Sequence, residues 1–327
     1  MLNPSIKQEI SAELARREPR FQPADFSFEL IVSDDRNIYR VNAPGSANYI
    51  FKTVGSARKS ASEFIDEFAV LSKLSTKAAT SGKTINTPVP IKLLDDQGML
   101  MTECPGDTLK SHYFRSLVRP LERTGLVDAI RQGAALLADI HGLSLRTEKY
   151  ADFRQNRQAN LSRMIDAALQ HPAEKPRAAT LRRAGELFEE INGEYADIAI
   201  CELHGNFALR NLLWDGAVVS TIDLEDSRTD TVYYDVALLV AEFINKNMFP
   251  LSRAYNSRLA EAFLQSYRER YPLDPRLLTS YVIYHLVWSY YELATRSKAR
   301  NPVKRLIVGF RKRQLCREIG KQIRTLA

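Results

Sequence analysis

One stretch near the middle of the chain, residues 198–226, constrains the fold more than any other. It begins with a short apolar run that predicts a buried strand, and then enters a polar loop that contains His204 to Asn206. Leu212 to Trp214 and Val218 to Ile222 follow as two predicted strands, joined by Asp215-Gly216. Asp-Gly between apolar runs is a strong hairpin signal, so the stretch is expected to fold as strand, loop and hairpin.

The predicted hairpin returns Asp223 to the neighbourhood of Asn211. An amide oxygen and a carboxylate at strand ends are ligands that suit a hard cation such as Mg²⁺ carrying phosphate oxygens. The two residues are therefore the candidate metal ligands.

This stretch resembles the catalytic core of the aminoglycoside phosphotransferase and choline kinase group, relatives of the protein kinases. The group's pattern is His-Gly-Asp, four residues, Asn, and some ten residues later Ile-Asp before a short acidic segment. The matching residues are His204, Gly205, Asn211, Ile222 and Asp223, whereas Asn206 stands where the group has its catalytic-base Asp. The resemblance extends over roughly residues 27–243.

The resemblance implies an α+β, bilobal protein-kinase-like fold. Residues 1–104 would form a small, mainly β N-lobe with one key helix. Residues 105–327 would form a larger, mainly helical C-lobe that holds the catalytic loop, 200–226, and a basic C-terminal helix. ATP and Mg²⁺ are the implied cofactors, and a hydroxyl of a small molecule, sugar or glycan is the implied acceptor.

The N-terminal third fits this plan. Asn3-Pro4 is an N-cap followed by proline at the first helical position, and it predicts a helix to about Arg17. Strands are expected over 26–32, 37–41 and 48–53. A helix follows, with apolar residues at helical spacing from Phe64 to Leu74.

The resemblance assigns nucleotide contacts to this region. Lys52 would grip the α- and β-phosphates, and Glu67 would hold that lysine; alternatively, both are solvated ends of ordinary elements. The loop after Ser33 lacks a Gly-x-Gly-x-x-Gly pattern, yet the Ser33 hydroxyl could contact phosphate. Residues 101–106 resemble the linker whose backbone binds adenine, at Glu103; alternatively, Pro105-Gly106 is an ordinary turn.

In the resemblance, Asp223 holds Mg²⁺, Asn211 holds the same or a second ion, and His204 fixes the loop. Asn206 leaves two hypotheses open. It either orients the acceptor while Glu225, Asp226 or the phosphate takes the proton, giving a slower kinase, or the protein is a pseudokinase-like nucleotide-binding or scaffold protein. An amide accepts a hydrogen bond but has negligible basicity, so whether the protein is an enzyme depends on this residue.

The second half is expected to be mainly helical, with helices over 126–143, 150–171, 177–195, 234–246, 252–271 and 274–297. His141 is interpreted as a buried structural histidine. Asp235 either braces the catalytic loop or caps a helix. The aromatic residues between Tyr281 and Tyr291 are interpreted as core of the C-lobe.

Charge is unevenly distributed along the chain. Residues 296–327 hold eleven Lys or Arg and one acid, Glu318, so this tail has a net charge of +10. The whole chain has a net charge of +7, so the remaining residues together carry −3. Because the chain outside the tail is not basic, binding of nucleic acid by the body of the protein is not expected. The tail helix either packs on the C-lobe or contacts an anionic membrane, and a neutral or anionic acceptor suits this charge distribution better than a polycation.

The remaining composition indicates a folded protein of the cytoplasm, or one peripheral on the inner membrane face. Apolar and charged fractions of 45% and 26% are ordinary. No run reaches the roughly 18 apolar residues of a membrane span, and the N-terminus has no apolar signal core. Cys104, Cys201 and Cys316 form no spacing motif and are expected as buried, reduced thiols.

Overall fold

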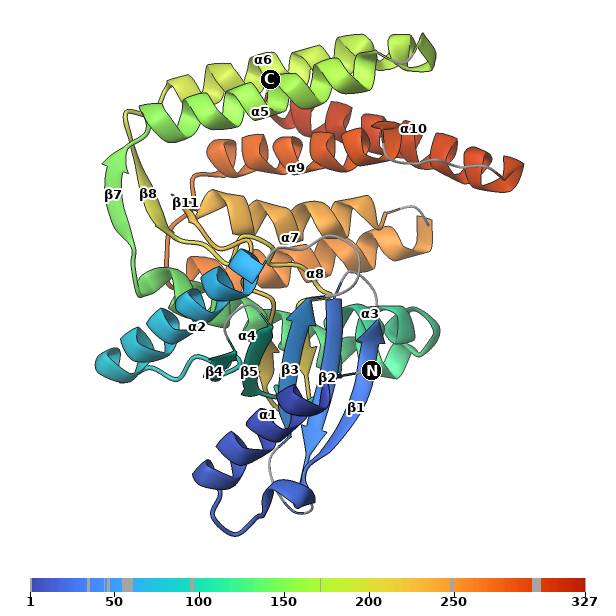
Figure 1. The fold of residues 1–327 in the computed structure, drawn as a ribbon. Coiled ribbons are helices and arrows are strands. Elements are labelled where there is room, and N and C mark those ends of the chain that lie inside the picture. Colours follow the sequence, from blue (N-terminus) through green and yellow to red (C-terminus); the bar gives the residue numbers. More distant parts are fainter. Residues whose placement is uncertain are drawn as a thin grey trace. The chain divides into compact units, whose positions relative to one another are not determined.

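The computed structural model describes residues 2–33, 36–43, 45, 48–54, 61–94, 97–170, 172–247, 250–295 and 301–326. The chain divides into two compact units: Met1–Gly106 with Ser220–Ser227, and Asp107–Val219 with Arg228–Ala327. The first is built on an antiparallel sheet and the second mainly on helices, which confirms the α+β prediction (Figure 1). The division into lobes at residue 104 stays a prediction.

The first unit contains a five-stranded sheet in the order β1-β2-β3-β5-β4, in which every neighbouring pair is antiparallel. The strands are β1 (Ser27–Ser33), β2 (Arg36–Asn42), β3 (Tyr49–Val54), β4 (Pro90–Leu94) and β5 (Gly98–Thr102). The three predicted N-terminal strands are thus present, with ends shifted by one residue.

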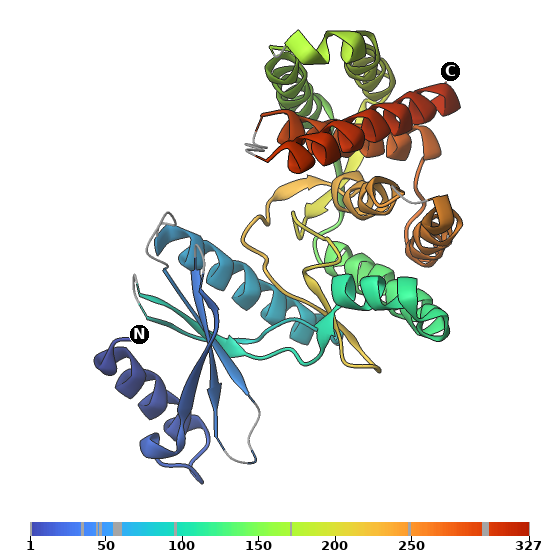
Figure 2. The same cartoon turned by 90° about the vertical axis from the view of Figure 1, so that its right-hand side faces the viewer.

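Two helices cover opposite faces of this sheet, α1 (Pro4–Arg17) and α2 (Ala61–Ser81) (Figure 2). The predicted cap of α1 is present, because the Asn3 side chain accepts the Ser5 N–H over 2.9 Å. A short 3₁₀ turn, Pro23–Asp25, connects α1 to β1. The core on the α1 side contains Ile10, Leu14, Phe26, Tyr39, Val41, Tyr49, Phe51, Leu94 and Leu100.

The pleat of β3 determines where Lys52 points. Successive side chains of a strand project to opposite faces. Phe51 is fully buried in the core on the α1 side, so Lys52 projects towards α2, where Glu67 lies. The alternation of the strand therefore places a lysine in the layer between sheet and helix.

The second unit is mainly helical. Its helices are α3 (Leu109–Val118), α4 (Arg123–Gly142), α5 (Ala151–Leu169), α6 (Ala178–Gly193), α7 (Tyr233–Asn245), α8 (Pro250–Arg268), α9 (Pro275–Thr295) and α10 (Pro302–Leu326). Short 3₁₀ segments lie at Pro120–Glu122 and Pro172–Arg177. The predicted helices are present, and α3 is an addition to them.

Two small sheets accompany these helices. One has the order β10-β9-β6, formed by Val219–Thr221, Leu212–Trp214 and Asp107–Thr108. The other has the order β11-β8-β7, formed by Thr229–Thr231, Asp197–Glu202 and Arg146–Lys149. The predicted Asp215-Gly216 hairpin joins β9 to β10: the Asp215 carboxylate accepts the Ala217 and Val218 N–H groups over 2.8 Å, and Gly216 has φ +101°.

Helix α9 lies at the centre of this unit and contacts α5, α6, α7 and α10 (Figures 1 and 2). It is apolar on all sides, as expected of a helix surrounded by others. Tyr281 and Tyr290 are fully buried, which confirms the predicted aromatic core. Trp288 and Tyr291 are only partly buried, and both line cavities.

The basic tail forms α10, and its two halves differ. Leu315 and Ile319 in the C-terminal half are buried, so the packing hypothesis holds for that half. In the N-terminal half, Leu306 is 70% exposed and belongs to an exposed apolar stripe with Val303, Ile307 and Phe310. Contact of this half with a membrane stays a prediction, and residues 296–300 of the tail lie outside the described residues.

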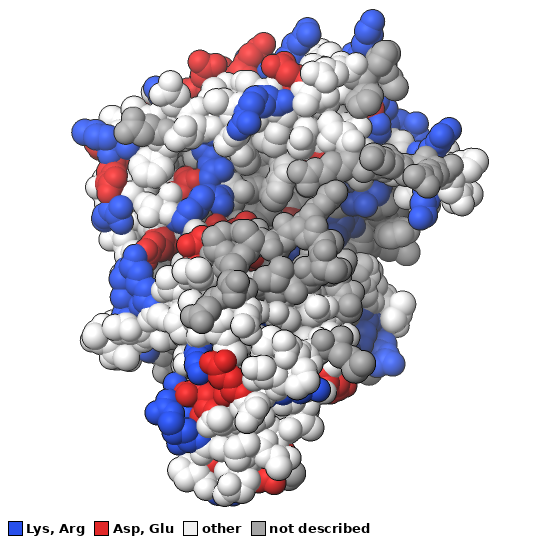
Figure 3. Space-filling model, in the orientation of Figure 1, with Lys and Arg blue, Asp and Glu red and all other residues white. Residues whose placement is uncertain are grey.

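Within the described ranges, no helix is both long and apolar enough to cross a membrane. The three cysteines carry free thiols, as predicted, but only Cys201 is buried; the prediction of burial is wrong for Cys104 and Cys316, which are partly exposed. The face of the molecule in Figure 3 carries acidic and basic side chains interspersed over both units.

Candidate functional site

The polar loop of residues 203–211 follows β8, and the Asp235 carboxylate accepts hydrogen bonds from the backbone at its start. The backbone N–H groups of His204 and Gly205 donate to the two oxygens of Asp235, over 2.7 and 3.0 Å. Gly205 has φ +83°, a left-handed conformation that suits glycine and turns both N–H groups towards the same side chain. Because the N-cap of α7 is Val232, Asp235 is a brace for the loop and the capping alternative is wrong.

Asp235 is itself held by a buried chain of hydrogen bonds. His141 Nε2 lies 3.3 Å from Asp235 Oδ2, and His141 Nδ1 lies 2.7 Å from the Tyr267 hydroxyl. Burial by itself would raise the pKa of Asp235, but the hydrogen bond and charge of His141, with the His204 contacts, lower it below its ordinary value. The carboxylate therefore stays ionised, and His141 has the structural role predicted for it.

His204 is 0% exposed, so it does not reach a substrate. Its Nδ1 accepts the Asn206 N–H over 3.3 Å, and its ring meets Phe207 edge-on with centroids 5.5 Å apart. These contacts fit the loop-fixing role that the resemblance implied, and that role stays a prediction.

Asn206 is engaged by a residue that the sequence had not indicated. Arg210 donates from Nη2 to Asn206 Oδ1 over 2.7 Å. On the other side, Asn211 Nδ2 donates to the Asn206 carbonyl over 2.9 Å, which orients the Asn211 amide. Glu242 of α7 also fastens the loop by accepting the Leu209 N–H over 2.9 Å. The only sequence signal for this contact is that Arg210 lies four residues after Asn206.

A cavity of about 400 Å³ opens beside Asn206 within the second unit. Its walls come from the loop, α7, α9 and α10. They include Asn206, Arg210, Glu242, Lys246, His285, Trp288, Ser289, Glu292 and Arg311. Trp288 and Arg311 had been interpreted as core and as tail, so sequence reasoning missed them as parts of a site.

A second cluster of predicted residues lies in the first unit. The Lys52 ammonium is 2.8 and 3.0 Å from the two oxygens of Glu67 and 3.2 Å from Oδ1 of Asp223. Lys52 and Glu67 are buried, whereas the Asp223 side chain is 23% exposed. The alternative in which Lys52 and Glu67 are solvated ends of elements is therefore wrong, and an exposed carboxylate edge lies next to a buried cation.

Backbone geometry at two positions fixes this cluster. Asp223 has φ +68°, the one positive value among the described non-glycine residues. Such conformations occur where the surroundings over-determine them, frequently at functional sites. Gly98 has φ +150°, and a Cβ there would lie 2.1 Å from the Lys52 carbonyl oxygen. The close approach of β5 to β3 at Lys52 thus requires glycine.

The other predicted nucleotide contacts are less well defined. The Glu103 side chain pairs with Arg40 (2.7 Å), and the Glu103 N–H donates to the Asn48 carbonyl over 3.0 Å. Any adenine contact at Glu103 therefore falls to its carbonyl. Ser33 ends β1, and its side chain and residues 34–35 lie outside the described residues.

The chemistry of Lys52 and Asp223 fits a magnesium nucleotide. A buried ammonium suits phosphate oxygens, and a partly exposed carboxylate suits a hard cation. The described part of the chain holds no cluster of three or more His, Cys, Asp or Glu that could bind a metal. Asn211 and Asp223 lie in different units, and their convergence stays a prediction.

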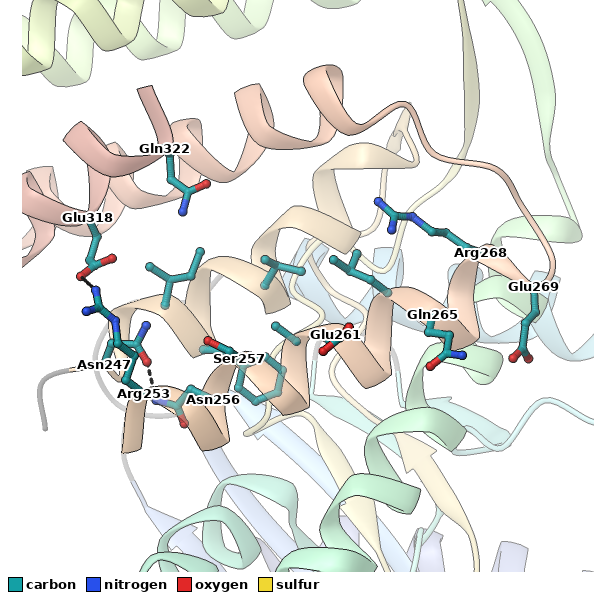
Figure 4. A pocket seen from close by; sticks show the side chains of 15 residues that line it. Asn247, Arg253, Asn256, Ser257, Glu261, Gln265, Arg268, Glu269, Glu318 and Gln322 are labelled. Atoms are coloured by element: carbon teal, nitrogen blue, oxygen red, sulfur yellow. Dashed lines mark hydrogen bonds and ion pairs between the residues drawn. The ribbon is translucent and has the colours of Figure 1, made fainter. Parts of the chain in front are cut away.

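A larger cavity, of about 810 Å³, lies away from all of these residues, between α7, α8 and α10 (Figure 4). Its rim holds an ion pair of Arg253 with Glu318 (2.9 Å) and a hydrogen bond from Asn256 to Asn247 (2.9 Å). None of the predicted site residues lines it.

An antiparallel sheet with a lysine–glutamate pair, followed by a helical unit with a braced His-Gly loop, defines the class of kinase-like phosphotransferase folds. The family model of the phosphotransferase enzyme family matches residues 28–275. The chain belongs to this family. No curated protein matches it.

Solved structures with similar folds are enzymes that act on small molecules. A glucosamine kinase in complex with glucosamine, ADP and inorganic phosphate is 16% identical, with a TM-score of 0.64 over 94% of this chain and 82% of that one. An amicoumacin kinase with AMP-PNP and Ca²⁺ is 12% identical, with a TM-score of 0.61 over 95% and 96%. A choline kinase from Cryptosporidium parvum is 13% identical, with a TM-score of 0.61 over 97% and 96%.

Proposed function

We propose that the protein is an ATP-dependent phosphotransferase that acts on a hydroxyl of a small molecule, sugar or glycan. The observation that carries the proposal is the buried Lys52 ammonium between Glu67 and Asp223. An ammonium held by a carboxylate at fixed geometry is suited to bind phosphate oxygens without reorganisation. The solved relatives that hold ADP or AMP-PNP with Ca²⁺ support a nucleotide and a divalent cation.

Each residue of the site has a separate role in this proposal. Lys52 binds the α- and β-phosphates, Asp223 and Asn211 hold Mg²⁺, and the loop with Asn206 orients the acceptor hydroxyl. The hydroxyl oxygen bonds to the γ-phosphorus while the bond from that phosphorus to the bridging oxygen breaks and ADP leaves. The hydroxyl proton goes to a phosphoryl oxygen or to one of the two acids that follow Leu224.

Asn206 makes a second candidate function worth testing. Its Oδ1 accepts from Arg210, and an amide does not take a proton. A protein that binds nucleotide with little turnover, acting as a pseudokinase-like binding module, is therefore the alternative. Turnover separates the two, whereas nucleotide binding is common to both.

Nucleotide binding tests the site that both candidate functions require. We expect ATP to raise the melting temperature of the purified protein, and Mg²⁺ to increase that shift. Asp223→Ala should remove the Mg²⁺ dependence, and Lys52→Met should weaken the binding of ATP with or without Mg²⁺. Asp66→Ala is the matched control, because it removes an exposed acid of the same unit that has no assigned role. No shift with any nucleotide at several millimolar would refute the proposal.

A further inference from the structure

We infer that the acceptor is an anionic sugar, bearing a carboxylate or phosphate, whose charged group binds Arg311 in the cavity beside Asn206. This inference rests on the proposed phosphotransferase function. The cavity joins the loop to α7, α9 and α10, and all of its walls belong to one compact unit. Its chemistry is therefore defined by the second unit alone.

The strongest indication is an unsatisfied donor. Arg311 lines the cavity, and its Nε is buried with no hydrogen-bond partner among the described residues. A buried polar group left unpaired destabilises the folded protein, and more so when it is charged. Guanidinium N–H groups bind carboxylate and phosphate oxygens in preference to neutral acceptors. An anion at this position would satisfy the donor.

The balance of charge in the cavity points the same way. Three cationic side chains, Arg210, Lys246 and Arg311, face two carboxylates, Glu242 and Glu292. Glu242 is already engaged, because it forms an ion pair with Lys246 and accepts the Leu209 N–H. A cationic acceptor would thus compete with existing partners, while an anion meets one net positive charge.

His285 supplies a complementary acceptor for a sugar hydroxyl. Its Nε2 donates to the Tyr234 carbonyl over 2.9 Å, so this nitrogen carries the proton. Burial lowers the pKa of His285 to about 3, which keeps the ring neutral. Nδ1 is consequently a bare acceptor, and it too is buried without a partner in the described part of the chain.

Trp288 provides an apolar wall in the same cavity. Its ring is partly exposed and can cover the C–H face of a sugar ring. One cavity therefore combines an unpaired cationic donor, an unpaired acceptor and an aromatic surface. This combination fits a hydroxyl-rich ring with a negative group better than it fits a polyamine.

The two tryptophans allow a binding test that needs no turnover. Trp214 lies outside the cavity lining, so Trp214→Phe leaves Trp288 as the single tryptophan, which is excited selectively at 295 nm. Glucuronate, glucose 6-phosphate, glucose and glucosamine are titrated into this variant. We expect a saturable fluorescence change with one of the two anionic sugars, at concentrations at least ten-fold lower than for glucose or glucosamine. Which of them binds distinguishes carboxylate from phosphate.

Arg311→Gln, made in the same background, should weaken the binding of the anionic sugar about 10- to 100-fold, the range of a charge-assisted hydrogen bond. Arg313→Gln is the matched control, since Arg313 is exposed on the same helix and does not line the cavity. Tighter binding of glucosamine, equal binding by Arg311→Gln, or no binding of either anionic sugar would overturn the inference. An ATP-induced thermal shift in the same protein shows independently whether the nucleotide site is present, and ATP turnover with the bound sugar shows whether the phosphotransferase proposal survives.

Discussion

Arg210 and Asn206 form a hydrogen bond in which the guanidinium Nη2 lies 2.7 Å from the amide oxygen. The sequence resemblance predicts a catalytic position at residue 206, and the amide found there is paired with a cation four residues away. Any carboxylate introduced at residue 206 would therefore meet a guanidinium.

Asn206→Asp should raise turnover by less than the roughly 10²–10⁴-fold expected of a positioned general base. Arg210 would lower the pKa of the new carboxylate and with it its basicity. The double variant Asn206→Asp, Arg210→Gln should be the faster of the two, with Arg210→Gln alone as control. ATP hydrolysis rates measure this. A single variant as fast as the double would show that the pair does not restrain the carboxylate.

Gly98→Ala should destabilise the first unit by about 1–3 kcal/mol, as overpacking does. The added Cβ would lie 2.1 Å from the Lys52 carbonyl oxygen, so β3 has to shift and ATP affinity should fall as well. Gly309→Ala is the control, because no atom lies within 4 Å of its added Cβ and alanine favours the helix. Urea unfolding followed by circular dichroism checks the prediction, which unchanged unfolding of Gly98→Ala would contradict.

His285 should make the second unit less stable as pH falls. Burial lowers its pKa in the folded state to about 3, whereas the unfolded chain takes up a proton near its ordinary pKa of about 6.5. Stability from the neutral ring is therefore present above pH 6.5 and is lost between pH 6.5 and 3, by about 2 kcal/mol from pH 7 to pH 5.

His285→Gln keeps an N–H donor for the Tyr234 carbonyl and removes the titration. Its stability should change less than that of the parent between pH 7 and pH 5. Both tryptophans belong to the second unit, so their fluorescence reports its unfolding in urea. Parallel pH profiles for parent and variant would show that this histidine titrates normally.

The exposed half of α10 should bind anionic vesicles better than neutral ones, because an apolar stripe lies among Lys and Arg residues. Leu306→Gln with Ile307→Gln should reduce co-sedimentation about ten-fold or more, through lost apolar burial. Leu121→Gln, which alters a 97% exposed leucine elsewhere, should have no effect. Equal sedimentation of all three proteins would leave the stripe as an ordinary solvated face.

The sequence by itself determined those parts that depend on neighbours in the chain. Asn3 caps α1, Asp215-Gly216 closes the hairpin, and the period of β3 separates Phe51 from Lys52, because each depends on backbone geometry within a few residues. The motif around His204 likewise indicated the family. In contrast, β7 consists of Arg-Thr-Glu-Lys, a segment without a strand signal, and it is a strand because β8 pairs with it.

Only the tertiary structure decided which residues surround Asn206. Arg311 lies 105 positions further along the chain, and the sequence did not determine which surface its helix packs against. The sequence left two roles open for Asp235, bracing the loop or capping a helix, and its hydrogen bonds to the loop backbone decide for bracing. Contacts between residues far apart in sequence depend on how helices pack, and packing responds to summed shape and burial over many side chains. No local pattern records that sum, so the cavity and its unpaired donors appear only in the folded chain.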